Sequence, residues 1–533
     1  MGGRDDAVTD GSGGAVPTSN LAPTSTSGKL WARVAEPSPT FHSPRMPVPP
    51  PDVPLLLPRP WGAALTAALV ALNLVASLHA ILRKRDVRAA TGWTGLIWLV
   101  PGVGALLYAA LGLNRIKRRA SLMHRARRRA PLTTTGQLRI ARARGQALAD
   151  PQLHALATLA EAVADRPALS GNAVTFLRDG DEAYPAMLEA IGGARHTIGL
   201  STYIFGDDAA GRPIIDALAA AVRRGVEVRV LVDGVGARYS WPPAHRALRA
   251  AGVPTALFLA GLRDAGLGFF NLRTHRKILT VDGVVAFTGG MNIRATHLLA
   301  SRPAHPVRDL HFRLAGPVVA QIQDAFAEDW AFTTGEFLEG PGWYPRLEDV
   351  GETVARVITD GPDGDLEVLH TVLLGALAMA RESVRIVTPY FLPDQSLIAA
   401  LGVAARRGVQ VDIVLPARGN ILPVQWAAAA QLWQVLRPGC RVFFTPPPFD
   451  HSKVMVVDRR WALIGSTNWD PRSLRLNFEL DVELYCPRSA ATLDDLVAAR
   501  IAGARQATLA ALDARSLPIK VRDGIARLFS PYL

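Results

Sequence analysis

A histidine and a lysine two residues apart open the stretch HSKVMVVDRRWALIGSTNWDPRS at 451–473. On an extended strand, residues two apart face the same side, so His451 and Lys453 are expected to point together. An imidazole beside an ammonium group is a pair suited to handling phosphate. A single H-x-K pattern before an apolar strand also fits an exposed strand end, and by itself it does not establish a site.

The same pattern occurs a second time in the chain. Residues 275–292 read HRKILTVDGVVAFTGGMN, and His275 lies 176 residues before His451. Six positions correspond at identical spacing: His275, Lys277, Asp282, Gly289, Gly290 and Asn292 match His451, Lys453, Asp458, Gly465, Ser466 and Asn468.

A second matched block lies upstream of each motif, at 201–236 and 388–420. Each block predicts a strand, a polar turn, an amphipathic helix that ends in Arg-Arg-Gly, and an apolar strand. The glycine stops the helix, and the arginines complement its C-terminal dipole. A duplication of this size predicts two similar half-domains, with the connector between them at 335–350.

Strand and helix patterns alternate through the whole region. Apolar runs at 197–204, 226–232 and 253–259 are separated by amphipathic helices, and the runs at 383–388 and 409–415 repeat the arrangement. This alternation predicts an α/β fold in which helices cover a mixed sheet.

Two H-x-K-x4-D motifs, each followed by G-G/S-x-N in a duplicated α/β chain, resemble the phospholipase D superfamily over roughly residues 172–533. Two apolar stretches near the N-terminus make the bacterial cardiolipin synthase branch the most similar. The expected fold is α/β, with two similar phospholipase D-like half-domains related by a pseudo-twofold axis and preceded by an N-terminal transmembrane helical hairpin.

This organisation gives five expected segments. They are a disordered tail rich in Pro, Gly and Ser (1–58), two transmembrane helices (59–114), a basic juxtamembrane segment (115–170), the first half-domain (171–345) and the second half-domain (346–533).

The two apolar stretches are long enough to cross a bilayer. Residues 61–82 and 89–113 carry no formal charge, and about 20 apolar residues span a hydrocarbon core of ~30 Å. A pair of buried core helices is the alternative. RKRDVR at 83–88 would form the hairpin loop. Residues 115–149 contain eleven basic residues and no acid, so we expect a multi-pass inner-membrane protein whose catalytic domain faces the cytoplasm. The same tract equally fits a surface that binds anionic lipid headgroups.

Charge and cysteine content bound the function. The chain has a net charge of +13, but residues 150–533 hold 39 basic and 40 acidic residues. A nuclease of this superfamily should carry a basic groove on its catalytic domain, so no nucleic-acid partner is expected. Cys440 and Cys486 provide neither a disulfide framework nor metal-ligand spacing.

The resemblance implies a reaction without a metal or other cofactor. One imidazole attacks phosphorus and forms a phosphatidyl-histidine, while the other protonates the departing glycerol oxygen. By analogy His275 is the nucleophile and His451 the acid/base, although the repeat itself is symmetric. Lys277 and Lys453 would neutralise the phosphoryl oxygens. Hydrogen bonds to the same oxygens would come from Asn292 and Asn468.

Further residues match the family pattern in supporting roles. Asp309 and Glu479 match the acid that follows each repeat and would hold an imidazole N–H. Gly290 and Ser466 would let the backbone pass close to the phosphate. Asp282 and Asp458 are equally well explained by catalysis and by strand-end structure, so they are motif members in a supporting role. Tyr203, Phe205, Tyr390 and Phe391 fit either the core or a substrate cleft.

Two departures concern headgroup choice. Many relatives enter the second motif through Leu-His, whereas here Phe449-Asp450 precedes the histidine. Asn420 stands where relatives often carry an acid. The function expected is a cardiolipin synthase that converts two phosphatidylglycerol molecules into cardiolipin and glycerol. The alternatives are a phospholipase D-type hydrolase, a nuclease and an inactive membrane scaffold, and the oligomeric state is open.

Overall fold

The computed structural model describes residues 59–84, 87–112, 150–259, 272–362 and 367–530. The predicted tail at 1–58 and the basic tract at 115–149 lie outside the described residues. The chain divides into two units at Ala68, within helix α1 (Arg59–Arg83).

The two apolar stretches behave differently. Among the described residues, Trp61–Arg83 in α1 is the one helix that is long and apolar enough to cross a membrane. The second stretch is divided into α2 (Val87–Leu99), α3 (Val103–Leu107) and a π-helical turn, Tyr108–Gly112. The break falls at Pro101 and Gly102, as expected for a residue without a backbone N–H followed by a residue at φ +80°.

Polar side chains join α1 to the second stretch. The backbone N–H of Gly102 donates to Asn73 Oδ1 at 3.3 Å, and Trp98 Nε1 donates to Ser77 Oγ at 3.1 Å. Asn73 and Ser77 are both buried. Such bonds between helices satisfy groups that lipid could not.

The described residues in the first part of the α/β region form seventeen elements. They are α6 (Pro151–Ala164), β1 (Leu169–Arg178), α7 (Asp179–Gly193), β2 (Thr197–Thr202), α8 (Gly211–Arg223), β3 (Glu227–Asp233), η2 (Gly236–Tyr239), α9 (Ala244–Ala250), β4 (Thr255–Phe258), β5 (Arg273–Thr274), β6 (Ile278–Val281), β7 (Val285–Gly289), η3 (Ala295–His297), η4 (Leu299–Ser301), β8 (Val307–Arg308), β9 (Leu310–Ala315) and α11 (Val318–Thr334).

The second part follows a connector without a helix or strand at 335–352. Its elements are β10 (Thr353–Asp360), α12 (Val368–Met379), β11 (Ser383–Val387), α13 (Gln395–Arg406), β12 (Gln410–Pro416), α14 (Leu422–Gln431), α15 (Trp433–Leu436), β13 (Arg441–Thr445), β14 (Phe449–Asp450), β15 (Val454–Val457), β16 (Trp461–Gly465), β17 (Asn477–Tyr485), α16 (Pro487–Ala502), β18 (Arg505–Gln506), α17 (Leu509–Asp513) and α18 (Leu517–Leu528).

The matched upstream blocks form corresponding elements. In the first, α8 connects the parallel strands β2 and β3, and in the second, α13 connects the parallel strands β11 and β12. The Arg-Arg-Gly sequence ends each helix with a left-handed glycine, Gly225 at φ +88° and Gly408 at φ +90°. The glycine stop predicted from sequence is therefore present in both copies.

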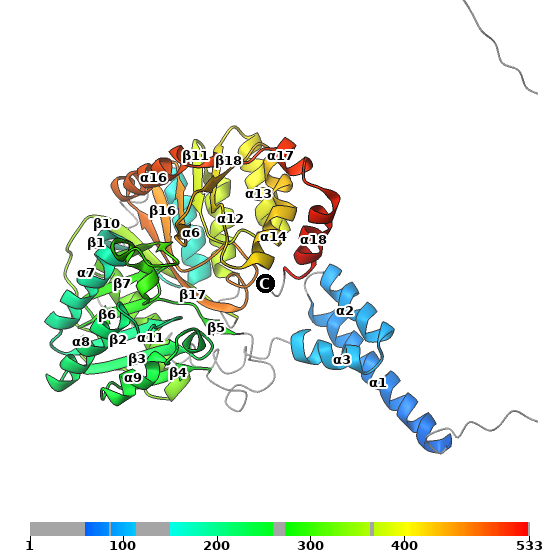
Figure 1. The fold of residues 1–533 in the computed structure, drawn as a ribbon, viewed down its shortest axis with the longest axis horizontal. Coiled ribbons are helices and arrows are strands. Elements are labelled where there is room, and N and C mark those ends of the chain that lie inside the picture. Colours follow the sequence, from blue (N-terminus) through cyan, green and yellow to red (C-terminus); the bar gives the residue numbers. More distant parts are fainter. Residues whose placement is uncertain (1–58, 85–86, 113–149, 260–271, 363–366, 531–533) are drawn as a thin grey trace, which may run out of the picture. The chain divides into compact units, whose positions relative to one another are not determined.

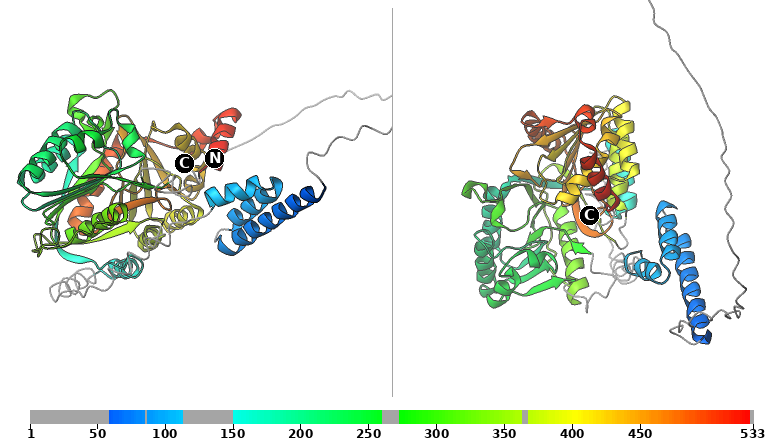
Figure 2. Two further views of the ribbon diagram at one scale, coloured as in Figure 1. Left: turned by 90° about the horizontal axis from the view of Figure 1, so that it is seen from below. Right: turned by 45° about the vertical axis from the view of Figure 1, so that its right-hand side comes forward.

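Sixteen of the described strands form one mixed sheet in the order β18-β13-β12-β11-β15-β16-β17-β10-β1-β9-β7-β6-β2-β3-β4, with β5 added beside β17, and β8 and β14 form a separate two-stranded sheet. β10 lies at its centre and pairs antiparallel with β1 and with β17, so it joins the two parts of the region. Helices cover both faces of the sheet (Figures 1 and 2). The α/β fold with a mixed sheet is confirmed.

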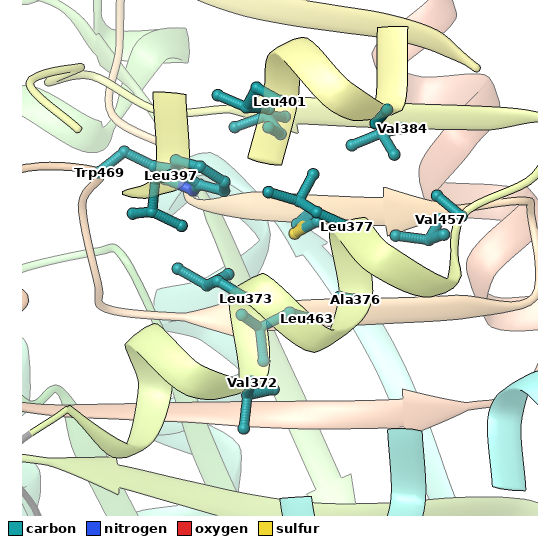
Figure 3. Packing of buried hydrophobic residues seen from close by; sticks show 14 of the residues in the cluster. Val372, Leu373, Ala376, Leu377, Val384, Leu397, Leu401, Val457, Leu463 and Trp469 are labelled. Atoms are coloured by element: carbon teal, nitrogen blue, oxygen red, sulfur yellow. The ribbon is translucent and has the colours of Figure 1, made fainter. Parts of the chain in front are cut away.

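Three apolar clusters hold the layers together. One packs α7 and α8 against the first part of the sheet, and another packs α6, α12 and α13 against the second part. Leu373 and Leu377 of α12 and Leu397 and Leu401 of α13 all belong to the latter cluster (Figure 3). The third cluster contains α11 and α16 together with strand residues from both parts, so the two parts share a core.

A buried ion pair connects β10 and β17 at the centre of the sheet. Arg356 and Glu483 are both fully buried, and Arg356 Nε lies 2.6 Å from Glu483 Oε2. The guanidinium also donates to Tyr485 Oη at 2.7 Å and to the Ala157 carbonyl at 2.9 Å. Every partner needed to compensate for burial of these charges is present.

We predict that Arg356→Met lowers the free energy of unfolding by about 3–5 kcal/mol, because it leaves the Glu483 carboxylate buried without a counter-charge. Arg356→Met/Glu483→Gln should recover most of this loss, since no buried charge remains. Thermal unfolding of the purified protein measures both. A double variant no more stable than the single one would contradict the explanation.

Candidate active site

The first motif is held by a strand from the second part of the chain. β5 pairs parallel with β17, and the backbone N–H of His275 donates to the Phe478 carbonyl at 2.9 Å. The second motif is held reciprocally. β14 pairs parallel with β8, and the backbone N–H of His451 donates to the Arg308 carbonyl at 2.8 Å. Each histidine is therefore positioned by the other part of the chain.

The carboxylates cross in the same way. His275 Nδ1 lies 3.0 Å from Glu479 Oε2, and His451 Nδ1 lies 2.8 Å from Asp309 Oδ2. Both carboxylates are fully buried, and both histidines are 8% exposed. The sequence predicted these acids as partners of the imidazoles, but it did not indicate that each acid serves the histidine of the other motif.

The two carboxylates differ in their surroundings. Glu479 also accepts hydrogen bonds from Ser466 Oγ at 2.6 Å and from Asn477 Nδ2 at 3.0 Å. Burial favours its protonated form, but the charges and hydrogen bonds of His275, Lys277 and Ser466 outweigh burial and lower the pKa of Glu479. Burial raises the pKa of Asp309 to about 6, even with Lys453 nearby.

Each lysine side chain donates a hydrogen bond to the backbone carbonyl of the histidine in its own motif. Lys277 Nζ donates to the His275 carbonyl at 2.6 Å, and Lys453 Nζ donates to the His451 carbonyl and lies 2.9 Å from His451 Nδ1. Burial lowers the pKa of Lys277 to about 7 and that of Lys453 to about 8. These ammonium groups are ready to receive an anion, because a bound negative charge would offset the cost of burying them.

The lysines of both motifs influence the pKa of each histidine. Burial, followed by the charges of Lys277 and Lys453, lowers the pKa of His275 to about 4. Burial and the same two lysines also lower the pKa of His451. Both imidazoles are therefore neutral at physiological pH in the free protein, and an unprotonated imidazole is a competent nucleophile.

The comparisons with known proteins agree with this geometry. The family described as "Cardiolipin synthase, PLD-like domain" matches residues 187–330 and 373–500. A second family, described as "Phospholipase_D-nuclease N-terminal", matches residues 71–112. The chain belongs to the phospholipase D-like cardiolipin synthase family.

Two relatives extend over nearly the whole chain. Cardiolipin synthase A of Pseudomonas aeruginosa PAO1 is 33% identical over 477 residues, which cover 88% of this chain and 96% of the relative. The major cardiolipin synthase of Bacillus subtilis strain 168 is 29% identical over 479 residues, which cover 87% of this chain and 97% of the relative. Among solved structures, phosphatidylserine synthase of Haemophilus influenzae has the same fold at a TM-score of 0.54, with 14% identity, over 71% of this chain and 100% of that chain.

Two aspartates of the family motif do not face the imidazoles. The strands β6 and β15 separate Asp282 and Asp458 from the histidines and lysines. Both carboxylates instead accept backbone N–H groups, Asp282 from Arg195, His196 and Thr197 at 2.7–2.9 Å, and Asp458 from Arg381, Glu382 and Ser383 at 2.7–2.9 Å. These contacts favour the strand-end interpretation of both residues over a direct role in catalysis.

The small residues after each motif lie against the carboxylates. A Cβ on Gly290 would lie 2.4 Å from Asp309 Oδ1, so this position has no room for a side chain. Its counterpart, Ser466, fills the corresponding space with the hydroxyl that binds Glu479. These residues support the acids.

The two asparagines are buried at the site. Asn292 Oδ1 accepts from the backbone N–H of Ile204 at 3.1 Å. Asn468 Nδ2 donates to Ser473 Oγ at 3.1 Å. Each side chain thus organises a nearby loop in the free protein.

The two sequence departures have local explanations. Asp450 forms an ion pair with Arg500, whose Nε lies 3.1 Å from its Oδ2. The Asp450 carboxylate is therefore paired with the Arg500 guanidinium. Asn420 Oδ1 accepts a hydrogen bond from Tyr390 Oη at 2.8 Å.

The aromatic residues divide between core and site. Phe205 and Phe391 are buried in apolar clusters. The ring of Tyr203 lies 5.3 Å from that of His275, and the ring of Tyr390 lies 6.4 Å from that of His451. The phenols, but not the phenylalanines, therefore border the imidazoles.

Sequence reasoning missed Asp233 at the end of β3. Its Oδ2 accepts the backbone N–H of Thr274 at 2.9 Å, and its Oδ1 binds the N–H groups of Val235 and Gly236. It fixes the residue immediately before His275. An acid at the carboxyl end of a buried parallel strand was the available signal.

The described part of the chain contains no group of three or more His, Cys, Asp or Glu residues arranged to hold a metal ion.

We predict that Asp458→Ala loses about 3 kcal/mol of stability, because three backbone N–H groups at the start of β11 lose a charged acceptor. Asp282→Ala should behave alike. The folded fraction of either variant should keep turnover within a few-fold of the parent. Thermal unfolding together with specific activity tests this; complete loss of turnover in a folded variant would return these residues to the catalytic group.

Proposed function

We propose that this protein is a cardiolipin synthase that transfers a phosphatidyl group from one phosphatidylglycerol to the glycerol hydroxyl of another, releasing glycerol. The observation that carries the proposal is the pair of buried imidazoles, each backed by a carboxylate from the opposite part of the chain. The cardiolipin synthase relatives support the choice of reaction.

The reaction runs in two displacements at phosphorus. Nε2 of His275 forms a bond to phosphorus while the bond to the glycerol oxygen breaks, and His451 gives that oxygen a proton. The second phosphatidylglycerol then enters. His451 takes the proton from its hydroxyl, the hydroxyl oxygen bonds to phosphorus, and the bond to His275 breaks.

The carboxylates support this assignment of roles. The pKa of Glu479 is lowered, so its charge holds Nδ1–H of His275 and leaves the lone pair on Nε2 for attack. Asp309, with a pKa of about 6, exchanges protons more readily and suits the histidine that must gain and lose one. The negative substrate phosphate would raise the pKa of His451 and allow it to act as an acid.

The remaining side chains provide positive charge and hydrogen bonds. Lys277 and Lys453 would neutralise the non-bridging oxygens, and Asn292 and Asn468 would donate to them once substrate displaces part of their present contacts. Two half-sites that each supply one histidine, one lysine and one asparagine fit a pair of half-domains related by a pseudo-twofold axis, with halves at 171–345 and 346–533.

The N-terminal region would hold the site at its substrate. We propose that α1 crosses the inner membrane and that α2 with α3 returns through it, so that the protein is multi-pass and the catalytic region faces the cytoplasm. The buried polar bonds between α1 and the second stretch support a helical hairpin in lipid.

We predict that the purified full-length protein, given phosphatidylglycerol alone with a chelator present, forms cardiolipin and free glycerol in equal amounts. Lipid mass spectrometry and a glycerol assay measure the two products. Phosphatidic acid without cardiolipin would instead show hydrolysis. His275→Ala and His451→Ala should each abolish turnover, whereas His154→Ala, at an exposed histidine of α6, should not. Near-normal turnover in either site variant would refute the two-histidine mechanism.

A pH profile tests the role of the buried lysines. Lys277 is charged below its pKa of about 7 and neutral above it, so kcat/KM should fall as the pH rises through about 7. The guanidinium of Lys277→Arg stays charged at all these pH values. We expect a lower kcat/KM for this variant, because a guanidinium is larger than an ammonium group. Its alkaline decline should move to about 8, the pKa of Lys453. An unmoved decline would show that Lys277 does not set it.

A further inference from the structure

Helix α18 exposes an apolar stripe. Leu517, Val521, Ile525 and Leu528 follow one another at helical spacing and are 73%, 51%, 53% and 77% exposed. The opposite side of the helix carries the buried Ala526, which packs against Val424 and Ala427 of α14. The stripe therefore stays exposed while Ala526 packs against α14.

The stripe continues onto α14, which lies beside α18 (Figures 1 and 2). A groove of about 670 Å³ runs between the two helices, with Pro423 and Trp426 on one side and Val521 and Ile525 on the other, and its lining is almost wholly apolar. At the start of α14, Ile421 and Leu422 are 45% and 54% exposed. A contiguous apolar surface of this kind marks an interaction site. We refer to Ile421, Leu422 and the α18 stripe as the α14–α18 face.

The charges around this face are basic. Lys520 and Arg522 are exposed on α18, and the Arg522 guanidinium lies 4.4 Å from the centre of the Trp426 ring. The one acid of α18, Asp523, is buried and binds Arg515 and Arg522. An apolar stripe bordered by cations is the pattern of a helix that lies in the interface of an anionic bilayer.

The face is connected to the catalytic imidazoles by packing. Tyr390, whose ring lies 6.4 Å from that of His451, packs against the cluster that joins α14 to α18. Tyr390 therefore contacts both His451 and the cluster that holds α14 and α18 together.

The first part of the chain repeats this connection. The loop after β3 exposes Tyr239 by 58% and Trp241 by 87%. The ring of Tyr239 lies 6.2 Å from that of Tyr203, which in turn lies 5.3 Å from His275. Tryptophan and tyrosine are the side chains that favour the lipid headgroup layer. β3 and β12 are the corresponding parallel strands, and the exposed apolar residues follow the carboxyl end of each.

We propose that the α14–α18 face and the Tyr239–Trp241 loop dock on an anionic phospholipid surface, with their apolar side chains in the boundary between headgroups and acyl chains. Docking here would bring lipid headgroups to both imidazoles. The docking surface goes beyond the proposed function and holds for any phospholipid reaction at the site.

Site-specific quenching tests the contact directly in the full-length protein. A fluorophore is attached at Val521→Cys in a Cys486→Ser background, and the protein is placed in nanodiscs of phosphatidylcholine and phosphatidylglycerol with nitroxide-labelled acyl chains. The matched control is Val403→Cys on α13, which has a similar exposure of 55%. Strong loss of emission at 521 and none at 403 is expected.

An equal loss of emission at positions 521 and 403 in the nitroxide-labelled nanodiscs would overturn the proposal. So would a label at 521 that is shielded in lipid-free detergent and insensitive to the nitroxide, because this result would indicate a second copy of the chain on the face. Neither outcome depends on whether the protein makes cardiolipin.

A second variant measures the consequence for turnover. Val521→Asp/Ile525→Asp should lower the rate on phosphatidylglycerol vesicles by on the order of tenfold or more, since burying one apolar side chain corresponds to about a tenfold change in partitioning. The rate on dispersed short-chain phosphatidylglycerol should be unchanged. Val403→Asp should affect neither rate. An equal loss on both substrates would show a structural effect and contradict the docking role.

Discussion

The exchange of carboxylates between the two motifs is the interaction on which the site depends. Glu479 holds His275 and Asp309 holds His451, and in each pair the two residues come from different parts of the chain. The backbone follows the same exchange through β5 on β17 and β14 on β8. Neither part of the chain could therefore orient its own imidazole, and association of the two parts and assembly of the site are one event.

This arrangement also explains how so many charges tolerate burial. Lys277 and Lys453 are nearly inaccessible, and each is stabilised by Glu479 and Asp309 against a desolvation cost that lowers both pKa values. The shared core around α11 and α16 excludes water from the sheet beneath them. A site of this kind suits an anionic phosphoryl group, because a bound negative charge would offset the cost of burying the two ammonium groups.

The sequence predicted the elements that occur in both parts of the chain, but it did not predict the contacts between the two parts. The helix stops at Gly225 and Gly408 and the α/β alternation follow from local spacing, and both appear as expected. The partner of each histidine depends on which strands pair across the duplication, and no local pattern encodes that. For Asp282 and Asp458 the sequence left catalysis and strand-end structure equally open, and the backbone contacts that favour the second come from a neighbouring strand.

Asp282 and Asp458, at the end of each H-x-K-x4-D motif, explain the spacing between its lysine and its aspartate. Each fixes the start of a neighbouring strand, β2 for Asp282 and β11 for Asp458, through three backbone N–H groups. The four-residue strands β6 and β15 then run from these anchors to the lysines. A strand advances by about 3.3 Å per residue, so a change in spacing by one residue would turn the lysine to the other face of the sheet. The aspartate thus sets the register that places each lysine beside the histidine of its own motif.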